Sequence, residues 1–451
     1  MSLVVLKFGG TSVGNAEKIR HVARVIADVA EQGNRVAAIV SAMGKTTDGL
    51  VELAGELVEN PSGREYDALL ATGEMVSAPL LAMTLTSMGY PAVSLNGQQA
   101  GFVTEDLHNR ARILEINTGR VQHHLDKGEI VIVTGFQGIN SKGDIATLGR
   151  GGSDTSAIAL AGALGADRCD IYTDVDGVYS ADPRVVPEAV RQDDITYIEM
   201  LELARVGAKV LHPRAVETAR NANVRIRVRS TFDPDNPGTL VSTYGTGGGS
   251  EGGQGGEGQS RAVSGIAADK KQVELAMTHV PDQPGIAAQL FGALASNNIS
   301  VDMIIQSVRQ DDNTNDIAFT VDQTDLQDTL TLLEKVKADM GSGEIYYETD
   351  VAKVSIVGVG MIDRPGIAAD MFKALAQANI NLKMISTSEI KISCLIDQAQ
   401  ADDAVRALHR QFFPEAANDE PKLVDAKGLL APPTLGNILC HPGPFFRATL
   451  H

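Results

Sequence analysis

The last third of the chain contains one segment twice. Residues 282–307, DQPGIAAQLFGALASNNISVDMIIQS, match residues 363–388, DRPGIAADMFKALAQANINLKMISTS, at 15 of 26 positions. In each copy a β-rich run precedes a Pro-Gly turn and an amphipathic helical pattern, and an alternating strand pattern follows. The four β-rich runs are residues 273–278, 316–321, 353–359 and 390–396. A duplication of this length predicts two copies of one folding unit, and we expect two α+β units of the ββαβ type.

A glycine-rich segment separates the duplicated part from the rest of the chain. Residues 245–260, GTGGGSEGGQGGEGQS, contain nine glycines and no large apolar side chain, so burial cannot offset the entropy of ordering them. We expect a flexible linker here. The C-terminal tail is proline-rich and lacks periodicity, so we expect it to be poorly ordered. The predicted divisions are a first domain at residues 1–242, a linker at 243–262, duplicated units at 263–345 and 346–413, and an extension at 414–451.

The first 242 residues alternate short β-rich runs with longer helical patterns. Strands are predicted at residues 3–8, 36–40, 130–134, 169–173 and 224–228. Helices are predicted at residues 16–31, 64–88, 110–126, 153–164 and 197–221. Most of the strand runs are continuously apolar, which is typical of strands covered on both faces. We therefore predict an α/β domain with a mainly parallel central sheet between two layers of helices, an αβα sandwich.

Charge and cysteine content exclude several classes of partner. The 451 residues include 57 Asp and Glu against 39 Lys and Arg, a net charge of −18, which argues against nucleic acid and anionic membranes as partners. A small anionic ligand needs only a few local cations. Three dispersed cysteines and the lack of an N-terminal signal segment predict a cytoplasmic location. The uncharged run at residues 75–104 contains Pro79 and Pro91 and is interpreted as helix, turn and strand, not as a membrane span.

The first candidate motif is KFGG at residues 7–10, at the end of the first predicted strand. Glycines between a strand and a helix let backbone N–H groups approach phosphate oxygens, and the helix N-terminus adds positive potential. Lys7 would supply a full positive charge to a phosphoryl group. Alone, the motif also fits a tight turn after a lysine. Residues 44–46 and 358–360 lack the glycine spacing of a P-loop and of a dinucleotide fingerprint.

The second motif is TLGRGGSD at residues 147–154, between a strand and a helix. Arg150 can bind a carboxylate through two N–H groups, and Asp154 lies in the first helical turn. A plain helix cap would explain Ser153 or Asp154, but it does not call for an arginine among three glycines.

The third motif is TDVDGVYSADPR at residues 173–184, after the fourth predicted strand. Asp174 and backbone groups could hold a nucleoside, while Tyr179 and Arg184 could contact base and phosphates. Alone this is a weak signal, because acid-glycine turns are common and could bind calcium. The spacing of an EF-hand is absent.

Three further residues are ambiguous by themselves. Glu74 follows a glycine in a helical pattern, where most glutamates are simply solvated. Lys209 could be a surface charge or a phosphate ligand. His212 is expected to be structural and not catalytic.

Nine segments, taken in order, resemble the aspartokinases of the amino acid kinase family. They are KFGGTSV, VSAMGKTTDGL, REYDALLATGE, QAGFVT, RILEI, TGFQG, TLGRGGSDTSA, YTDVDGVYSADPR and AKVLHPRAVE. The duplicated DxPGIAA segment and INLKMISTSEIKIS resemble the paired ACT domains of the lysine- and threonine-regulated members. The resemblance covers roughly residues 3–411, and the combination is far more specific than any one motif.

The resemblance implies ATP-dependent phosphorylation of the side-chain carboxylate of L-aspartate to 4-phospho-L-aspartate, the first step toward lysine, threonine and methionine. A carboxylate of pKa about 4 is ionised at neutral pH and needs no general base. It needs cancellation of its repulsion from the triphosphate, which Lys7, the Gly9 and Gly10 amides and a magnesium ion carried with ATP can supply. No metal ligand from the protein is predicted.

The resemblance also assigns roles to single residues by motif match. Lys7 and Asp154 form the catalytic pair, in which Asp154 orients Lys7. Arg150 and Glu74 hold the α-carboxylate and α-ammonium groups of aspartate. The substrate pocket is completed by Ser41, Thr47, Gly151, Gly152 and Ser153. The nucleotide site comprises Lys7, Phe8, Gly9, Gly10, Thr173, Asp174, Tyr179, Arg184, Lys209 and Val210.

The ACT repeats are implied to sense an effector, with lysine and threonine as the expected ligands. The expected ligand loop region contains Asp282, Gly285, Ile286, Asn298, Ile299 and Gln306, with Asn379 and Ile380 opposite. ACT domains usually bind amino acids between copies, so a homo-oligomer through these domains is expected. Alternatively, these residues only build the turn and the helix cap. Inhibition requires that the effector prefer an inactive arrangement.

Two rival functions remain at this point. One is another amino acid kinase, acting on glutamate, acetylglutamate or UMP, but the pairing of Glu74 with Arg150 and the ACT repeats favour aspartate. The other is a non-catalytic amino-acid sensor on an inactive scaffold. The argument against it is the presence of Lys7, Arg150, Asp154 and Arg184.

Overall fold

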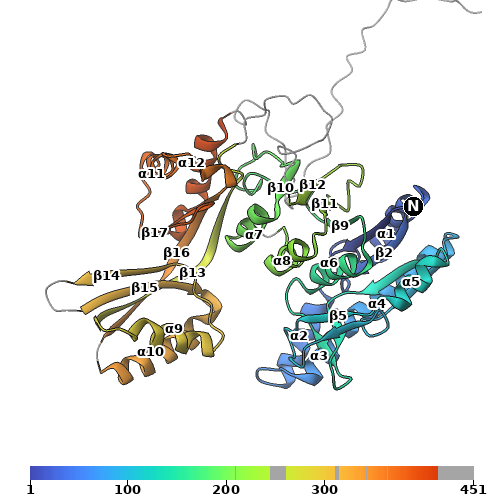
Figure 1. Cartoon of the computed structure of the whole chain (residues 1–451), viewed down its shortest axis with the longest axis horizontal. Coiled ribbons are helices and arrows are strands. Elements are labelled where there is room, and N and C mark those ends of the chain that lie inside the picture. Colours follow the sequence, from blue (N-terminus) through green and yellow to red (C-terminus); the bar gives the residue numbers. More distant parts are fainter. Residues whose placement is uncertain (209, 244–260, 310–313, 342, 363, 415–451) are drawn as a thin grey trace, which may run out of the picture.

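The structure is a computed structural model that describes residues 1–208, 210–243, 261–309, 314–341, 343–362 and 364–414. The glycine-rich segment, Lys209 and the tail from residue 415 lie outside these ranges, together with the predictions made for them. The described chain forms an N-terminal α/β part and a C-terminal part with two α+β units (Figure 1). Helix α7 (Tyr197–Arg205) lies where the two parts meet (Figure 1).

The N-terminal part is built on an eight-stranded sheet. Its strand order is β10-β12-β11-β9-β1-β2-β6-β3. In that order, the strands are Asp194–Thr196, Thr239–Ser242, Ile226–Ser230, Arg168–Thr173, Leu3–Phe8, Arg35–Val40, Ile130–Thr134 and Ala92–Leu95. All neighbouring pairs are parallel except β11 with β12. The prediction of a mainly parallel sheet is confirmed.

Helices cover both faces of this sheet, because side chains of each central strand alternate between two cores. In β1, Val4 and Leu6 pack with α1 and α4, whereas Leu3 and Val5 pack with α5, α6, α7 and α8. Besides α7, the helices on these two faces are α1 (Ala16–Glu31), α4 (Thr72–Ser87), α5 (Gly119–Asp126), α6 (Gly152–Leu164) and α8 (Pro213–Ala222). The αβα sandwich predicted from the sequence is therefore confirmed.

Local sequence signals set some helix ends, and packing sets others. Helix α1 has the predicted bounds, and the Asn15 side chain caps it by accepting a hydrogen bond from the Lys18 N–H at 2.9 Å. The predicted helix at 64–88 is divided into α3 (Arg64–Leu70) and α4. The predicted helix at 110–126 is wrong in its first half, which forms strand β5 (Ile113–Ile116).

The predicted helix at 197–221 is also divided, into α7 and α8. Gly207 has φ +113°, a conformation that glycine adopts far more readily than other residues, and Pro213 starts α8 where proline is favoured. The stretch Arg64–Ser87 is long and apolar enough to cross a membrane, but half of its apolar window is buried inside the fold. The core helix of a soluble protein can be equally long and apolar.

A four-stranded sheet with the order β5-β4-β7-β8 forms a second layer of the N-terminal part. Its other strands are β4 (Phe102–Thr104), β7 (Gln137–Ile139) and β8 (Ile145–Thr147). Strand β8 leads directly into the predicted TLGRGGSD motif. Helix α2 (Thr46–Leu57) follows β2 and contacts α3.

The C-terminal part forms one six-stranded sheet with the order β14-β15-β13-β16-β18-β17. In that order, the strands are Ile304–Arg309, Thr314–Asp322, Gly265–Pro281, Glu344–Val357, Lys391–Asp397 and Met384–Thr387. The helices are α9 (Ile286–Ser296), α10 (Leu326–Met340), α11 (Ile367–Gln377) and α12 (Ala401–Phe412). Each unit runs strand, helix, strand, strand, helix, and so ends in a second helix that a ββαβ order does not include.

Strands β13 and β16 each serve both units. Residues 265–269 of β13 pair with residues 353–357 of β16, while residues 272–281 of β13 pair with β15. The first unit has its own core, and a second core joins α11, α12 and β18 with Val263 and Ile266. A single cut at residue 345 therefore does not separate the two units, which share this one sheet.

Candidate active site

The candidate motifs meet at one edge of the eight-stranded sheet. Because β1, β2, β6, β9 and β11 run parallel, their carboxyl ends lie at the same edge. Strand β1 lies between β2 and β9 in the sheet. The chain passes from β1 to β2 on one side, and on the other side β9 is followed by β11. The connections therefore diverge between β1 and β9. In α/β sheets such a divergence opens a crevice where ligands bind.

Lys7 and Asp154 form an ion pair at this edge. The Lys7 Nζ atom lies 2.6 Å from Asp154 Oδ1, and the two side chains are only 10% and 14% exposed. Lys7 is the penultimate residue of β1, and Asp154 lies in the first turn of α6. Because both side chains are held by regular elements and largely shielded from water, the ammonium group has a fixed position.

The loop after β1 packs tightly against the loop after β2. A Cβ atom on Gly10 would lie 2.8 Å from the Ala42 carbonyl oxygen, so this approach requires glycine. Helix α1 begins at Ala16, the predicted position, so its N-terminus is separated from Gly9 and Gly10 by residues 11–15. The helix N-terminus beside Lys7 is that of α6, which adds positive potential at the same edge.

Phe8 and Gly9 contribute to the site only through the backbone. The Phe8 ring is fully buried and stacks on Tyr172, with ring centroids 4.8 Å apart. The Gly9 N–H group faces the Tyr172 carbonyl oxygen at a long distance of 3.4 Å. The Phe8 side chain therefore has a core role, and a ligand can meet only its backbone.

Glu74, on α4, is a buried carboxylate with an unused acceptor. It is 3% exposed, and its Oε1 atom accepts a hydrogen bond from the Ala42 N–H at 3.0 Å. Its Oε2 atom is buried without a partner among the described residues. Burial raises the pKa of Glu74 to about 7, although the Ala42 N–H opposes the shift. A buried acid with a free oxygen can bind a cationic group.

Ser41 and Thr47 lie beside this carboxylate. The Ser77 hydroxyl, one turn along α4, donates to the Ser41 carbonyl oxygen at 2.8 Å. A Cβ atom on Gly73 would lie 3.8 Å from the Thr47 hydroxyl oxygen. The structure thus brings the predicted Ser41, Thr47 and Glu74 together.

The TLGRGGSD loop requires glycine at two positions. Gly151 has φ +70°, and a Cβ atom on it would lie 2.3 Å from the His212 Cβ. A Cβ on Gly152 would lie 2.8 Å from the Phe136 ring. Arg150 is exposed at this turn, and Ser153 is buried at the start of α6.

His212 has the structural role that the sequence analysis expected. Its Nδ1 atom accepts a hydrogen bond from the Arg214 N–H at 3.3 Å and so caps α8. Burial lowers the pKa of His212. The ring is therefore neutral at neutral pH and can act as an acceptor at the cap.

Asp67, on α3, is a buried residue that the sequence analysis missed. It has no exposed surface, and its carboxylate accepts hydrogen bonds from the backbone N–H groups of Asn109 and Thr147 and from the Thr147 hydroxyl. The His108 ring also lies 2.9 Å from it. Asp67 therefore ties α3 to the start of the TLGRGGSD loop. The available signal was its spacing, three residues before the buried Leu70.

The residues predicted for the nucleotide lie on the other side of β1. Thr173 ends β9, and its hydroxyl donates to Asp174 at 3.1 Å. The Tyr179 hydroxyl donates to Asp176 at 2.8 Å. Arg184 pairs with Asp182, and its side chain is 67% exposed. Asp174, Arg184 and the neighbouring Val210 are at least partly accessible, and Lys209 lies outside the described residues.

Asp176 is a second acidic residue that the sequence analysis left unassigned. Its Oδ2 atom accepts a hydrogen bond from the Asn236 side chain at 3.1 Å and lies 3.9 Å from the Arg191 guanidinium. Together with the hydrogen bond from Tyr179, these contacts fix the turn after β9. Nothing local in the sequence pairs positions 176 and 236.

The predicted effector residues do not form one group within a single chain. Asp282, Gly285 and Ile286 lie at the start of α9, whereas Asn298 and Ile299 follow its end. The eleven residues of α9, of which Ile286 is the first, span about 16 Å. Gln306 lies on the edge strand β14, and Asn379 and Ile380 follow α11.

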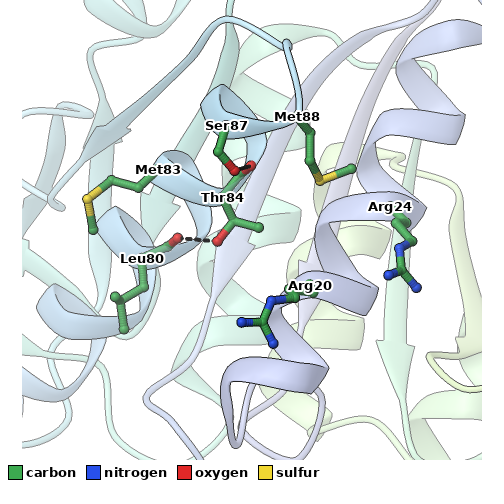
Figure 2. Close-up of a pocket in the computed structure, with 7 residues that line it drawn as sticks. All are labelled: Arg20, Arg24, Leu80, Met83, Thr84, Ser87 and Met88. Atoms are coloured by element: carbon green, nitrogen blue, oxygen red, sulfur yellow. Dashed lines mark hydrogen bonds between the residues drawn. The ribbon is translucent and has the colours of Figure 1, made fainter.

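A cavity of about 470 Å³ lies away from all of these residues, between α1 and α4. Figure 2 shows Arg20 and Arg24 on one wall and Met83 and Met88 on the other. The Thr84 hydroxyl donates to the Leu80 carbonyl oxygen of its own helix at 2.8 Å, and the Ser87 hydroxyl bonds to Thr84 in the same way (Figure 2). The two hydroxyl groups are thus used within the helix, which leaves the side chains of Arg20 and Arg24 as the charged groups that line the cavity.

Comparison with known proteins assigns the chain to a family. A profile of the amino acid kinase family matches residues 2–230, and ACT domain profiles match residues 275–339 and 354–412. An aspartate kinase from Stutzerimonas stutzeri is 47% identical over 91% of this chain and 97% of its own length. An aspartokinase from Geobacillus stearothermophilus is 48% identical, with the same coverage of both chains.

A solved structure gives the same assignment. Aspartokinase III from E. coli, in a complex with aspartate and ADP, is 29% identical, with a TM-score of 0.77 over 91% of this chain and 100% of that chain. The relatives, the two ACT matches and the Lys7–Asp154 edge of a parallel sheet agree with one another. The chain belongs to the aspartokinases, which are amino acid kinases with tandem C-terminal ACT domains, and it is an aspartate kinase.

Proposed function

We propose that the chain transfers the γ-phosphoryl group of ATP to the side-chain carboxylate of L-aspartate, giving 4-phospho-L-aspartate and ADP. The observation that carries this proposal is the Lys7–Asp154 ion pair of 2.6 Å, held between β1 and the N-terminus of α6. In the step, a carboxylate oxygen forms a bond to the γ-phosphorus, and the bond from that phosphorus to the β–γ bridging oxygen breaks. No proton is transferred, because the attacking carboxylate is already ionised.

Lys7 and the α6 N-terminus counter the repulsion between the two anions. Charge in a phosphoryl transfer spreads over the three equatorial oxygens, and a fixed ammonium group stabilises it without reorganisation. The Asp154 carboxylate keeps the Lys7 ammonium at the sheet edge. The glycines after β1 leave room for phosphate oxygens to approach the backbone.

We assign aspartate recognition to Arg150 and Glu74. The Arg150 guanidinium is exposed and can bind the α-carboxylate through two N–H groups. The unused Oε2 of Glu74 can accept a hydrogen bond from the α-ammonium group. An α-ammonium beside Glu74 lowers the pKa of that carboxyl, so aspartate binds together with ionisation of Glu74.

The nucleotide side is assigned to Thr173, Asp174, Tyr179, Arg184 and Val210. Arg184 and Lys7 provide cations for the phosphates, and the turn fixed by Asp176 provides backbone groups for the nucleoside. Among the described residues, no group of three or more His, Cys, Asp and Glu side chains is placed to hold a metal ion. We propose that Mg²⁺ arrives with ATP and supplies positive charge on the phosphate oxygens.

A hydroxamate assay tests the reaction. Only an acyl phosphate is trapped by hydroxylamine, so ATP, Mg²⁺ and aspartate should give hydroxamate, and glutamate should give little. Equal trapping with glutamate would favour a different amino acid kinase. Absence of trapping with either amino acid would favour a non-catalytic sensor.

Lys7→Ala assigns the signal to this site. The variant should lose at least about 10³-fold in kcat, comparable to removing a cationic group from a phosphoryl transfer. Lys127→Ala, at the end of α5, is the control that removes a surface lysine far from the sheet edge. Circular dichroism should show the same fold for both variants, and an active Lys7→Ala protein would remove Lys7 from the mechanism.

We further propose feedback inhibition by lysine, threonine or both, acting through an oligomer of ACT domains in the cytoplasm. Its support is that the predicted effector residues lie at opposite ends of α9, so a complete site calls for a second element. E. coli aspartokinase III has been solved in complex with lysine and aspartate. Aspartate turnover should fall when lysine or threonine is added, and unchanged turnover with both would reject this part.

A further inference from the structure

The segment that carries Tyr179 and Arg184 packs into the core of the second ACT unit. Ala181, Val186 and Ala189 are buried in one hydrophobic cluster with side chains from β13, β16, β18, α11 and α12. Among the described residues of the first ACT unit, only Val263, Ile266 and Ala268, at the start of the shared strand β13, belong to this cluster or pack against it. One part of the predicted nucleotide site is therefore supported by the regulatory half of the chain.

Ser180 fixes the segment through four polar contacts. Its N–H donates to the Val190 carbonyl oxygen at 2.8 Å, and its own carbonyl oxygen accepts from the Ile266 N–H at 2.7 Å. Its Oγ accepts from the Val190 N–H at 2.9 Å and lies 2.9 Å from His409 Nε2, on α12. Ser180 is 0% and His409 1% exposed. Water therefore cannot replace the contact if one partner is removed.

Two more contacts connect the same regions. The Arg406 guanidinium, also on α12, donates to the carbonyl oxygen of Val185 at 3.3 Å. Val185 directly follows Arg184 in the chain. The stretch that leads to Val210 touches the part of β13 that pairs with β16, because a Cβ atom on Gly207 would lie 2.7 Å from the Ala268 carbonyl oxygen. Both predicted nucleotide segments thus contact β13 where it joins the second ACT unit.

The first ACT unit offers an internal comparison for His409. Residues 321–323 and 396–398 are equivalent in the two units, because each ends a strand and leads through a short 3₁₀ turn into the last helix. Counted from there, the position of His409 in α12 is that of Glu334 in α10. Glu334 is exposed, whereas His409 is buried. The histidine is therefore explained by its contact with Ser180, which the second unit makes and the equivalent Glu334 of the first unit does not.

We propose that His409 is a positioning residue for the nucleotide. It holds Ser180, and with it the segment from Tyr179 to Arg184, in the arrangement that binds ATP. The inference rests on the proposed nucleotide role of this segment. The aspartate side lacks a comparable support, since within the described part of the chain the hydrogen bonds of Asp67 and Glu74 lie in the N-terminal part. Loss of the His409 contact should therefore weaken ATP binding and leave aspartate binding unchanged.

The test compares four single variants of the full chain and the double variant His409→Phe/Ser180→Ala. His409→Phe keeps a ring to stack on Phe413, whose centroid is 4.8 Å away, but removes Nε2. His409→Gln places an amide nitrogen near the position of Nε2. Ser180→Ala removes the other partner with the smallest change of volume. Glu334→Gln, at the equivalent position of the first unit, is the matched control. For each, KM for ATP, KM for aspartate and the Kd of Mg-ADP by calorimetry are measured.

His409→Phe and Ser180→Ala should each raise KM for ATP and the Kd of Mg-ADP about 3- to 10-fold, the value of one hydrogen bond. KM for aspartate should change less than about 2-fold. The double variant should be no worse than either single one, His409→Gln should recover most of the loss, and Glu334→Gln should match the parent. Unchanged ADP affinity in folded Ser180→Ala protein would overturn the proposal, as would an equal rise in both KM values.

These outcomes are separate from failure of the proposed reaction. A parent chain that gives no hydroxamate but binds Mg-ADP, with affinity lowered by Ser180→Ala, rejects the reaction and supports the positioning role. A parent chain that makes aspartyl hydroxamate while all variants bind Mg-ADP equally does the reverse. A parent chain that does not bind Mg-ADP rejects the positioning role.

Discussion

The two sides of the candidate active site are supported by different parts of the chain. On the aspartate side, Glu74 and Asp67 are held by contacts with β2, β8 and the loops of the α/β part. On the nucleotide side, Ser180 and its neighbours share a core with the second ACT unit. Lys7 and Asp154 lie between the two sides. A change in the regulatory half therefore reaches the nucleotide side directly and the aspartate side only indirectly.

The difference has a physical origin in packing. Closely packed interiors transmit displacement, because they have few voids to absorb it. The segment after β9 is buried against α12, so a shift of α12 must move it or break its hydrogen bonds. Among the described residues, the carboxylates of Glu74 and Asp67 form their hydrogen bonds only within the N-terminal part. Coupling between an effector and ATP therefore needs no flexible linker to carry it.

The largest expected effect comes from the pair shared by both sides. Asp154→Asn keeps the size of the side chain but removes the charge that holds the Lys7 ammonium. We expect kcat to fall about 10²- to 10³-fold, with similar changes in KM for ATP and for aspartate. Steady-state kinetics with each substrate varied in turn measures this. Asp48→Asn, on the exposed first turn of α2, is the control, and a selective change of one KM would show that the pair belongs to one side only.

The second prediction isolates the aspartate side. Glu74→Gln removes the negative charge proposed to bind the α-ammonium group, and losing one charged hydrogen bond in a buried site should raise KM for aspartate about 10- to 100-fold. KM for ATP should change less than about 2-fold. In the parent protein, KM for aspartate should also rise as the pH falls below about 7, the pKa of Glu74. A KM independent of both changes would exclude Glu74 from binding.

The same substitution should stabilise the ligand-free protein at high pH. The pKa of Glu74 is raised by folding from 4.5 to about 7, so the folded state favours the protonated acid. Stability present below pH 4.5 is lost as the pH rises through 7, by about 3 kcal/mol in total. Glu74→Gln escapes this loss and should be more stable than the parent by up to that amount at pH 8, and equal at pH 4.5. Urea unfolding at the two pH values measures the difference.

The third prediction concerns the support beneath the aspartate side. Asp67→Asn replaces one carboxylate oxygen by an amide that cannot accept hydrogen bonds from Asn109 and Thr147. The free energy of unfolding should fall by about 2 to 3 kcal/mol, and KM for aspartate should rise about 5- to 10-fold because the TLGRGGSD loop loses its anchor. Denaturant titration and kinetics measure both. If KM for ATP rose equally, the two sides would not be separable. Asp144→Asn, on the surface beside Arg64, is the control.

The sequence predicts elements well where the signal is local. The apolar run at residues 3–8 and the helical pattern at residues 16–31 predict bounds equal to those of β1 and α1 in the structure. The strand β5 was mistaken for helix because it is short and half exposed in a small sheet, so its residues carry little alternation. Its identity as a strand depends on pairing with β4, for example Phe102 with Ile116. The residue pattern within β5 alone does not show this pairing.

The candidate site follows the same division. The motifs predict Lys7, Asp154 and the glycines of the TLGRGGSD loop. Close backbone approach calls for glycine and ligand binding calls for charge, and both residue types occur within a few positions of one another in these motifs. The contact of Ser180 with His409 spans 229 positions, and Asp67 meets Thr147 across 80. Such pairs arise from the packing of whole elements, so each partner alone looks like an ordinary polar residue. The sharing of β13 by both ACT units escaped prediction for the same reason.

The smallest expected effect tests the junction away from the nucleotide itself. Glu199, on α7, is 5% exposed, and its carboxylate accepts hydrogen bonds from the Val359 N–H at 3.1 Å, from the Ser264 hydroxyl and, at 2.7 Å, from the Thr196 hydroxyl. Helix α7 leads to Gly207 and Val210 on the nucleotide side. Glu199→Gln loses acceptors on both sides of the junction, so we expect KM for ATP to rise about 2- to 3-fold and stability to fall by about 1 to 2 kcal/mol.

Glu202, on the same helix, supplies the control for this last prediction. It reaches the second ACT unit through an ion pair of 3.1 Å with Lys391, but its contact lies nearer to solvent than that of Glu199. Glu202→Gln keeps an oxygen that can accept a hydrogen bond from Lys391, so it should change KM for ATP less than Glu199→Gln does. A larger effect of Glu202→Gln than of Glu199→Gln on KM for ATP would mean that long-range charge couples the halves. The reverse order would locate the coupling in the buried hydrogen bonds, in agreement with the role proposed for His409.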